Sequence, residues 1–320
     1  MTRVVARRLI AILPTVIGIT LVAFVIARSA PGDPLAMQGD LGLRAGGATI
    51  QQMREYRRLM GLDEPIVSGY LRWLWHLLHG DLGSSFRDGR PVLVLLAEAL
   101  PVTLLLSVAS LVLGYLLAVP VGILSAAKPG GWFDRASSGL FFALYSLPVQ
   151  SVALLLVLCP TGLPIHGLHS EGERGVGDLI AHLGLPILCL TYGSLAVISR
   201  FLRSSMLEQM GQDYVRTARA KGLVEAVVIL RHALPNSLLS LITLLGLTFP
   251  ALASGAVIVE RIYGLPGIGK LTFDAVLGRD VPVLMGTVTL AGVVTMLSAL
   301  ASDLMYAAAD PRISLAARRP

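Results

Sequence analysis

Charged residues are scarce in this chain. Asp, Glu, Lys and Arg make up 14% of its 320 residues, whereas a soluble domain carries roughly 25%. Hydrophobic residues make up 54%. This balance excludes an ordinary soluble domain and favours a protein that crosses a membrane several times. The net charge of +6 is therefore interpreted as a feature of membrane topology, and no nucleic-acid partner is predicted.

Cysteine is scarce as well. Only Cys159 and Cys189 occur, in or beside apolar stretches, and they provide neither zinc-ligand spacing nor a disulfide framework. The chain has no H-E-x-x-H sequence and no Ser/His/Asp arrangement beside its apolar stretches. The sequence therefore favours two buried free thiols and a protein that is not itself an enzyme.

Two pairs of histidines raise the question of a metal site. His76 and His79 are three residues apart, and so are His166 and His169. Histidines with this spacing on one helix face can bind a metal. Neither pair has a clustered carboxylate or cysteine beside it, so we expect surface histidines, with no metal and no cofactor bound by this chain.

Six charge-free stretches are each about as long as the roughly 20 apolar residues that span a bilayer. They cover residues 9–27, 99–127, 136–165, 179–199, 236–259 and 281–302, and only His182 interrupts one of them. The first is followed by "SAPGDP" rather than a cleavage site, so it is not a signal peptide. The sequence predicts an all-α polytopic membrane protein with six transmembrane helices. An ion-coupled secondary transporter is less favoured, because none of the six stretches contains an acidic residue.

The distribution of Lys and Arg sets the predicted topology. These residues are concentrated in the short segments on one side of the six spans, which marks that side as cytoplasmic. Both termini are then cytoplasmic. The chain divides into an N-terminal tail with the first helix (1–29), an extracytoplasmic segment (30–97), a five-helix core (98–311) with a cytoplasmic loop (208–235), and a tail (312–320).

The extracytoplasmic segment contains the helical sequence "DEPIVSGYLRWLWHLLHGD". Asp63, Glu64 and Pro65 are typical of a helix start, and Gly80 of its end. One face of this helix is apolar: Ile66, Tyr70, Trp73, Leu74, Leu77 and Leu78. A second helix is predicted at 49–60. The segment is either a cap on the helix bundle or a docking platform for a partner that delivers substrate, and both interpretations are compatible.

The cytoplasmic loop 208–235 is too polar to span the membrane but has an amphipathic pattern broken at Gly222. This pattern predicts two short helices joined by a glycine turn, followed by Leu234 and Pro235 at the start of the fifth span. Such an element is suited to a groove on a cytoplasmic protein. Asp213 is a candidate cap for the first helix, and Ala218 is small enough for close approach to a partner. The basic Arg216, Arg219 and Lys221 either complement an acidic rim of such a groove or keep the loop on the cytoplasmic side.

The stretch "GLPGIGKLT" is nearly a phosphate-binding P-loop, but Leu271 stands where the P-loop has Ser or Thr after Lys270. The stretch also falls between the fifth and sixth spans, on the outer face. We therefore predict a tight turn near the mouth of the pathway, acting as a gate or docking element, built by Gly264, Pro266, Gly267 and Gly269.

Polar residues inside the spans are candidates for the translocation path, with helix packing as the equally open alternative for each one. They are Thr103, Ser107, Ser110, Tyr145, Ser146, Gln150 and Ser151.

The loop sequence "RTARAKG", nine residues, then "HALP" resembles the signature of the membrane subunits of ABC importers. Ala218, Gly222, Leu234 and Pro235 match it in register, whereas Arg216, Thr217 and His232 depart from the general pattern. "DYVRTARAKG", "APGDP", "MGLDEPI" and "GAVIVERIYGLPGIGKL" are similar to the peptide/nickel branch, and the long outer segment to its B-type, first permease subunit. The resemblance covers roughly residues 7–314.

This resemblance implies a type I ABC importer permease fold in a bacterial inner membrane. The implied partners are a second homologous permease, two cytoplasmic ATPases that bind ATP and Mg, and an extracytoplasmic substrate-binding protein, with membrane lipid around the spans. The loop around Gly222 would be the ATPase-coupling element. The implied substrates are di- or oligopeptides, and nickel or another small solute is the alternative.

Overall fold

The computed structural model describes residues 2–29, 64–172, 175–254 and 256–309. Within these ranges the chain is helical and has no strand, only an isolated bridge between Ser84 and Pro91. The helices are α1 (Thr2–Ser29), α4 (Ile66–Leu78), α5 (Val92–Ala127), α6 (Trp132–Tyr145), α7 (Val149–Leu158), α8 (Val176–Met210), α9 (Asp213–Ala220), α10 (Glu225–Val227), the π-helix η1 (Val228–Ala233), α11 (Leu234–Ser254), α12 (Val257–Ile262), α13 (Ile268–Leu277) and α14 (Val281–Ala309). The predicted all-α class is confirmed.

Among the described residues, four helical segments are long and apolar enough to cross a membrane, and a bent pair makes a fifth if it counts as one span. The four are Val92–Ala127, Val176–Met210, Glu225–Ile242 and Val281–Ala301, and the third of them joins the short segments α10 and η1 to the first part of α11. The first predicted span corresponds to α1, whose shorter apolar part is Pro14–Ser29. The chain is therefore a multi-pass membrane protein.

The third predicted span is a bent pair of helices, and the fifth ends earlier than predicted. Residues 136–165 form α6 and α7, which meet at an angle of 92° before Pro148. A proline lacks the N–H that continues a helix and disfavours helical backbone at the preceding residue, so Leu147 and Pro148 produce the bend. Residues 236–259 end α11 at Ser254 and begin α12 at Val257.

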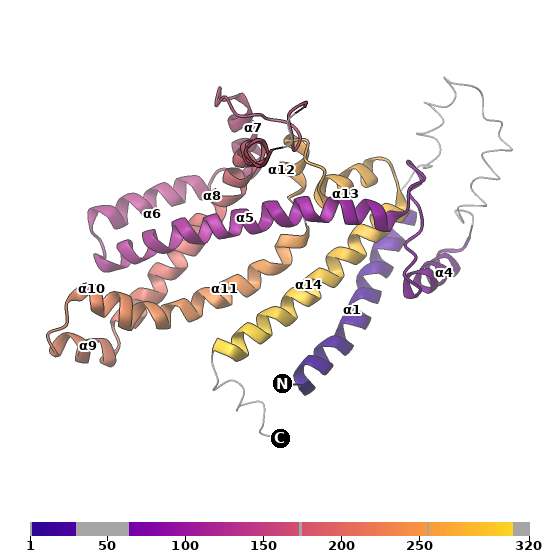
Figure 1. The fold of residues 1–320 in the computed structure, drawn as a ribbon. Helices are drawn as coiled ribbons and strands as arrows, with labels where there is room; N and C mark the ends of the chain where they lie inside the picture. The colour runs from indigo at the N-terminus through magenta and orange to yellow at the C-terminus, as the bar shows by residue number, and fades with distance from the viewer. Residues whose placement is uncertain (1, 30–63, 173–174, 255, 310–320) are drawn as a thin grey trace.

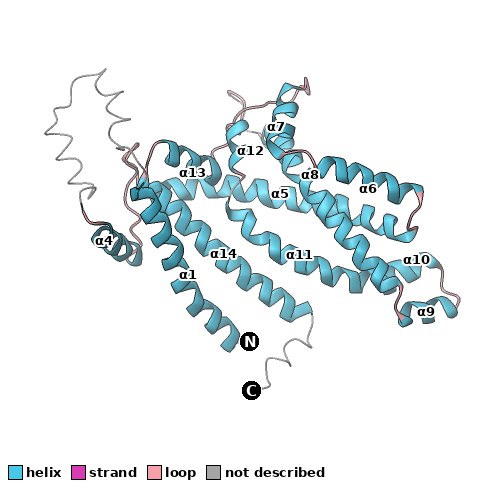
Figure 2. Cartoon of the chain, turned by 180° about the vertical axis from the view of Figure 1, so that it is seen from behind, coloured by secondary structure: helices cyan, strands magenta, loops and turns pink. Residues whose placement is uncertain are grey.

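The long helices lie side by side in a slab. α1, α14 and α11 follow one another, and α5, α8 and α6 continue the layer, an order visible from both sides (Figures 1 and 2). In Figure 1 the pair α9–α10 lies at the lower left and the start of α1 and the end of α14 lie at the bottom, whereas α7, α12 and α13 lie at the top and α4 at the right. The slab therefore has two distinct ends, each with its own short helices.

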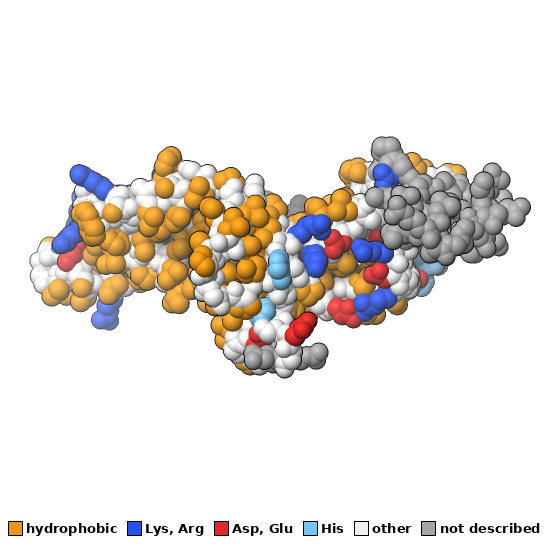
Figure 3. All heavy atoms as spheres, turned by 90° about the horizontal axis from the view of Figure 1, so that it is seen from above, with side chains coloured by type: hydrophobic (Ala, Val, Ile, Leu, Met, Phe, Trp, Pro, Cys, Tyr) orange, Lys and Arg blue, Asp and Glu red, His pale blue; other side chains and the backbone are white. Residues whose placement is uncertain are grey.

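Hydrophobic side chains cover much of the surface. Val112, Leu116 and Phe142 are 59%, 67% and 67% exposed, and orange side chains dominate the left half of the view in Figure 3. A soluble monomer does not leave so large an apolar surface exposed. This surface is suited to contact with lipid hydrocarbon and with neighbouring membrane helices.

Helix α4 confirms the helix predicted in the outer segment and caps α1. Pro65 is its N-cap residue, and Tyr70 is its buried centre. The Tyr70 hydroxyl donates to the Ile17 carbonyl at 3.0 Å, and its ring meets Phe24 edge-on at 5.6 Å. Ile66 and Leu78, at the two ends of the predicted apolar face, are exposed. The helix predicted at 49–60 lies outside the described residues.

Candidate functional site

The predicted cytoplasmic loop folds as two short helical segments around Gly222. Helix α9 ends at Ala220, the chain turns, and α10 leads directly into η1 and α11. Gly222 has φ +78°, a conformation that glycine adopts without steric cost. A Cβ atom at Gly222 would meet no atom within 4 Å. The glycine is therefore required by the backbone and not by crowding, as the sequence pattern predicts.

The loop has a small apolar core of its own. Val215 and Ala218 from α9 and Val228 from η1 are 0%, 4% and 0% exposed and form one cluster. Ala218 is thus buried inside the loop, which corrects the prediction that it offers a close approach to a partner. Its small size instead lets α9 pack closely on η1. This core makes the loop a compact body.

An ion pair closes the loop across the turn. The Arg219 guanidinium donates to both carboxylate oxygens of Glu225, at 3.1 and 2.6 Å. This contact lowers the pKa of Glu225 below its ordinary value and raises that of Arg219. Arg219 is therefore engaged within the loop. The Arg216 side chain, by contrast, is 73% exposed, and its guanidinium makes only a long contact of 3.6 Å with the exposed carboxylate of Asp213.

Asp213 does not cap α9 as predicted. The N-cap residue is Gln212, and no side chain caps the helix. Asp213 is instead the first helical residue, where its negative charge lies at the positive end of the helix dipole. The sequence correctly predicted that a helix starts here, but the N-cap position is one residue earlier, at Gln212.

The π-helix explains how the loop joins the fifth span. Pro235 has no N–H to donate to the carbonyl four residues earlier, and its ring would press on that carbonyl. The helix is therefore wider in the turn before Pro235, where the Leu234 N–H donates to the Ile229 carbonyl, five residues back. Pro235 then lies in the first turn of α11, and the partly buried Leu234 packs on the cluster with Ile229 and Ala233.

Hydrogen bonds connect the loop to the long helices on both sides. The Tyr214 hydroxyl on α9 donates to Gln209 Oε1 of α8 at 2.8 Å and accepts from Asn236 Nδ2 of α11 at 2.9 Å. The Ser205 and Ser240 hydroxyls of α8 and α11 lie 3.0 Å apart close by. The loop is therefore hydrogen-bonded to α8 and α11 together.

The near P-loop forms a tight turn between α12 and α13, as predicted. Gly264 has φ +64°. A Cβ atom at Gly269 would lie 2.7 Å from the Val257 backbone, and one at Gly267 would overlap the Glu260 carboxylate. Pro266 lies in the turn between these glycines. Two of the glycines are thus required by close packing and one by its backbone angle.

The side chain of Glu260 is the hydrogen-bond acceptor inside this turn. Glu260 is fully buried, and its Oε2 accepts the backbone N–H of Lys270 at 2.9 Å near the start of α13. Its Oε1 accepts from Thr103 Oγ1 at 2.9 Å and from the Ala256 N–H at 3.3 Å. The Lys270 ammonium contacts the Gly264 carbonyl at 3.4 Å. The turn is therefore closed around a side chain of the same chain.

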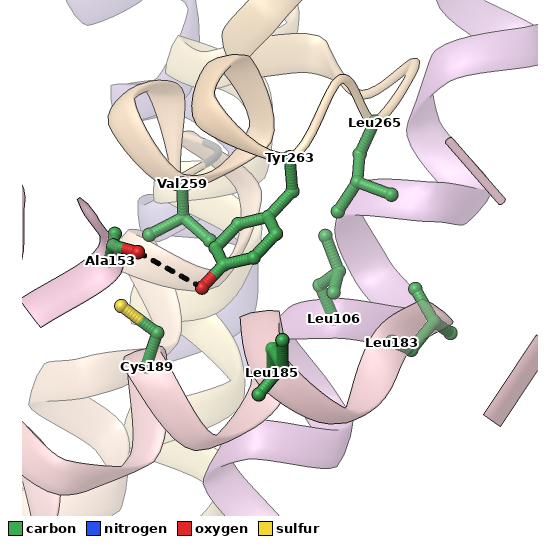
Figure 4. Packing of buried hydrophobic residues seen from close by; sticks show 8 residues of the cluster. All are labelled: Leu106, Ala153, Leu183, Leu185, Cys189, Val259, Tyr263 and Leu265. Atoms are coloured by element: carbon green, nitrogen blue, oxygen red, sulfur yellow. Dashed lines mark hydrogen bonds between the residues drawn. The ribbon is translucent and has the colours of Figure 1, made fainter. Parts of the chain in front are cut away.

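The aromatic ring of Tyr263 anchors the same turn. Tyr263 is fully buried, and its hydroxyl donates to the Ala153 carbonyl of α7 at 3.3 Å. Figure 4 shows the ring between Val259, Leu265 and residues of α5 and α8. The outer turn is thus fixed against α5, α7 and α8.

Two residues predicted for the translocation path have packing positions instead. Thr103 is fully buried and accepts the Ile268 N–H at 2.8 Å while donating to Glu260. It joins α5 to the turn between α12 and α13, which favours helix packing, the alternative interpretation of Thr103. Ser107 is buried on α5.

Tyr145, Ser146 and Gln150 gather at the bend between α6 and α7 and are exposed. Tyr145 is 66% exposed, and the Ser146 hydroxyl donates to the Phe142 carbonyl. A role for them in the path stays a prediction. Ser110 and Ser151 are the two further candidates for the path. The buried Ser110 hydroxyl donates to the Leu106 carbonyl, whereas the Ser151 side chain is exposed.

The histidines have partners close to them in the chain. His76 lies 3.2 Å from Asp81, and the His79 ring nitrogen lies 2.8 Å from the Trp75 carbonyl. His169 lies 3.0 Å from Asp178. In the ranges that the structure describes, no group of three or more His, Cys, Asp or Glu residues is arranged to hold a metal ion.

Comparison with known proteins defines the class. Residues 118–315 match the family described as binding-protein-dependent transport system inner membrane component, and residues 1–107 match its N-terminal region. The chain is 36% identical over 319 residues to the oligopeptide transport system permease protein AppB of Bacillus subtilis (strain 168), covering 98% of this chain and 99% of that one. It is also 36% identical over 340 residues to the dipeptide transport system permease protein DppB of Escherichia coli (strain K12), with the same coverage.

A solved structure supports the fold. An inward-facing conformation of the MetNI methionine ABC transporter superposes with a TM-score of 0.56 at 20% identity, covering 68% of this chain and 97% of that one. Fold and sequence together define a multi-pass membrane component of a transport system. The chain belongs to the family of binding-protein-dependent transport system inner membrane components, the permeases of ABC importers.

Proposed function

We propose that this chain is the B-type permease subunit of an ATP-driven peptide importer in a bacterial inner membrane. It forms half of the translocation pathway, and a second, homologous permease forms the other half. Two cytoplasmic ATPases hold ATP and Mg, and an extracytoplasmic binding protein delivers di- or oligopeptides. The full-length similarity to permeases named for oligopeptide and dipeptide transport supports this substrate class.

The observation that carries the proposal is the compact loop around Gly222. Its core of Val215, Ala218 and Val228 holds α9 and η1 together. Its outer surface keeps apolar residues exposed, including Val224 at 71% and Leu230 at 55%. A preformed helical body with an apolar surface is suited to a groove on a partner protein.

Coupling then follows from the loop's connections. When the ATPases close on ATP, the loop moves as a body, and Tyr214 transmits the displacement to Gln209 on α8 and to Asn236 on α11. Closure favours one of two packed arrangements of the spans over the other. With both termini cytoplasmic, the opposite end of the slab carries the Glu260 turn and α4, where the binding protein would dock.

The proposal is tested by purifying the tagged chain from its native membrane and reconstituting what co-purifies into proteoliposomes. We expect two ATPases and a second permease to accompany the chain, and uptake of labelled dipeptide only when ATP is present on the cytoplasmic face. Transport by the isolated chain without ATP would contradict the proposal.

A further inference from the structure

A groove lies between α6 and α8, and of its lining residues only Tyr145 is also a candidate for the translocation path. It has a volume of about 350 Å³ and is lined by Phe141, Phe142, Tyr145, Ala196, Val197, Arg200, Phe201 and Ser204. All eight residues belong to the described part of the chain, and none of them is acidic. The groove is therefore apolar apart from one cation, one hydroxyl and the phenol of Tyr145.

Arg200 and Ser204 lie close together at one end of this groove. Arg200 and Ser204 are one helical turn apart on α8, so their side chains share a face. In the described residues, neither side chain has a hydrogen bond or ion pair with another residue. Arg203, by contrast, is bound to the buried Asp134 of α6 through contacts of 2.5 and 2.7 Å. One arginine of α8 is thus neutralised, while its neighbour keeps a free positive charge.

The depth of the groove in the membrane follows from the helix geometry. At 1.5 Å per residue, Arg200 lies about 4.5 Å along α8 from Arg203, on the side of the apolar stretch 179–199. Trp132, 82% exposed at the start of α6, is an aromatic residue typical of the membrane–water interface. In the orientation proposed above, the charged end of the groove lies at the headgroup level of the cytoplasmic leaflet. The aromatic end lies deeper, among the acyl chains.

We propose that this groove binds one anionic phospholipid of the cytoplasmic leaflet. Its phosphate contacts Arg200 and Ser204, and part of an acyl chain lies along Val197, Phe142 and Tyr145. Basic pockets between membrane helices on the cytoplasmic side are suited to anionic headgroups. A headgroup with net negative charge is preferred over a zwitterionic one, because no carboxylate in the groove lining compensates Arg200.

The test is native mass spectrometry of the purified full-length chain with phosphatidylglycerol or phosphatidylcholine. We expect the chain to retain phosphatidylglycerol preferentially. Arg200→Gln should weaken retention about fivefold, since one interfacial cation contributes about 1 kcal/mol. Arg135→Gln is the matched control, because Arg135 is exposed on α6 at the same leaflet but does not line the groove; it should change retention less than twofold. Val197→Trp, which fills the groove without changing charge, should also reduce retention.

Three results would overturn the proposal. Equal losses of phosphatidylglycerol retention in Arg200→Gln and Arg135→Gln would show a general attraction of anionic lipid to the basic surface. Displacement of the lipid by inorganic phosphate would show an anion site that does not need the acyl chain. Efficient cross-linking of Val197→Cys to another subunit of the assembled complex would show that protein covers the groove. None of these readouts depends on transport, so their failure is distinguishable from failure of the proposed function.

Discussion

The buried carboxylate of Glu260 accepts the backbone N–H of Lys270 at 2.9 Å. The backbone of the turn thus binds a side chain of its own chain, and the Lys270 ammonium contacts the Gly264 carbonyl. Thr103 of α5, 157 residues away in the sequence, completes the arrangement by donating to the same carboxylate. The N-terminal half of α5 is thus joined to α12 and α13.

We predict that Glu260→Gln destabilises the protein by about 1–3 kcal/mol, because an amide NH₂ replaces one buried acceptor and leaves a donor unpaired. Thermal unfolding in detergent measures this loss. The double variant with Thr103→Val should lose less than the sum of the single losses, since both residues act through one contact. Strict additivity would contradict the coupling between them.

Gly269→Ala should also destabilise the outer turn, because its Cβ would lie 2.7 Å from backbone atoms of Val257. Overpacking of this kind costs about 1–3 kcal/mol. Gly139→Ala is the control: Gly139 is in α6 and no atom lies within 4 Å of its Cβ position. That variant should keep or slightly raise the unfolding temperature, and an equal loss in both would contradict the packing argument.

The ion pair between Arg219 and Glu225 predicts a pH dependence. The pKa of Glu225 is lowered from 4.5, so the stabilisation from the pair is fully present above pH 4.5. It is lost as the pH falls through the lowered pKa. A carboxyl-carbon NMR titration of labelled Glu225 should show a midpoint below 4.5, and Arg219→Gln should return it toward that value. Arg216→Gln should leave it unchanged, and an unchanged midpoint in Arg219→Gln would refute the pairing.

The sequence allowed the class and most helices to be predicted because apolar length and charge distribution are local signals. α8 and α14 match their predicted stretches, and the turn at Gly222 was visible as a break in an amphipathic pattern. The bend at Pro148 had a signal, the proline itself, but the uninterrupted apolar composition concealed it. Apolar length alone does not distinguish a straight span from a broken one.

The role of Glu260 was missed because it immediately follows the apolar stretch 236–259 and looks like the first polar residue of a loop. Its burial depends on Thr103 and on the α13 backbone, which only the tertiary fold brings together. For the same reason Thr103 was predicted to line a path, although its hydroxyl is used inside the packing. Sequence spacing contains no information about such long-range pairs.

Gly222→Ala should weaken coupling without unfolding the protein. The substitution places a Cβ at φ +78° in open space, so only backbone strain of about 1–2 kcal/mol is expected. Gly130→Ala is a matched control, because Gly130 has φ +72° and also has no atom within 4 Å of its Cβ position, in the turn between α5 and α6. Substrate-stimulated ATPase activity should fall in Gly222→Ala and stay near wild type in Gly130→Ala. An equal fall of ATPase activity in both variants would show that backbone strain in general, and not the turn at Gly222, causes the effect.

The central claim is that ATP drives transport through the loop at Gly222. Its most direct test is peptide uptake and substrate-stimulated ATP hydrolysis by the reconstituted complex carrying Gly222→Pro, since proline cannot adopt the φ of +78° that the turn requires. We predict an assembled complex that hydrolyses ATP at its basal rate, with uptake and substrate stimulation both lost. Unaltered peptide uptake by that complex would contradict the account.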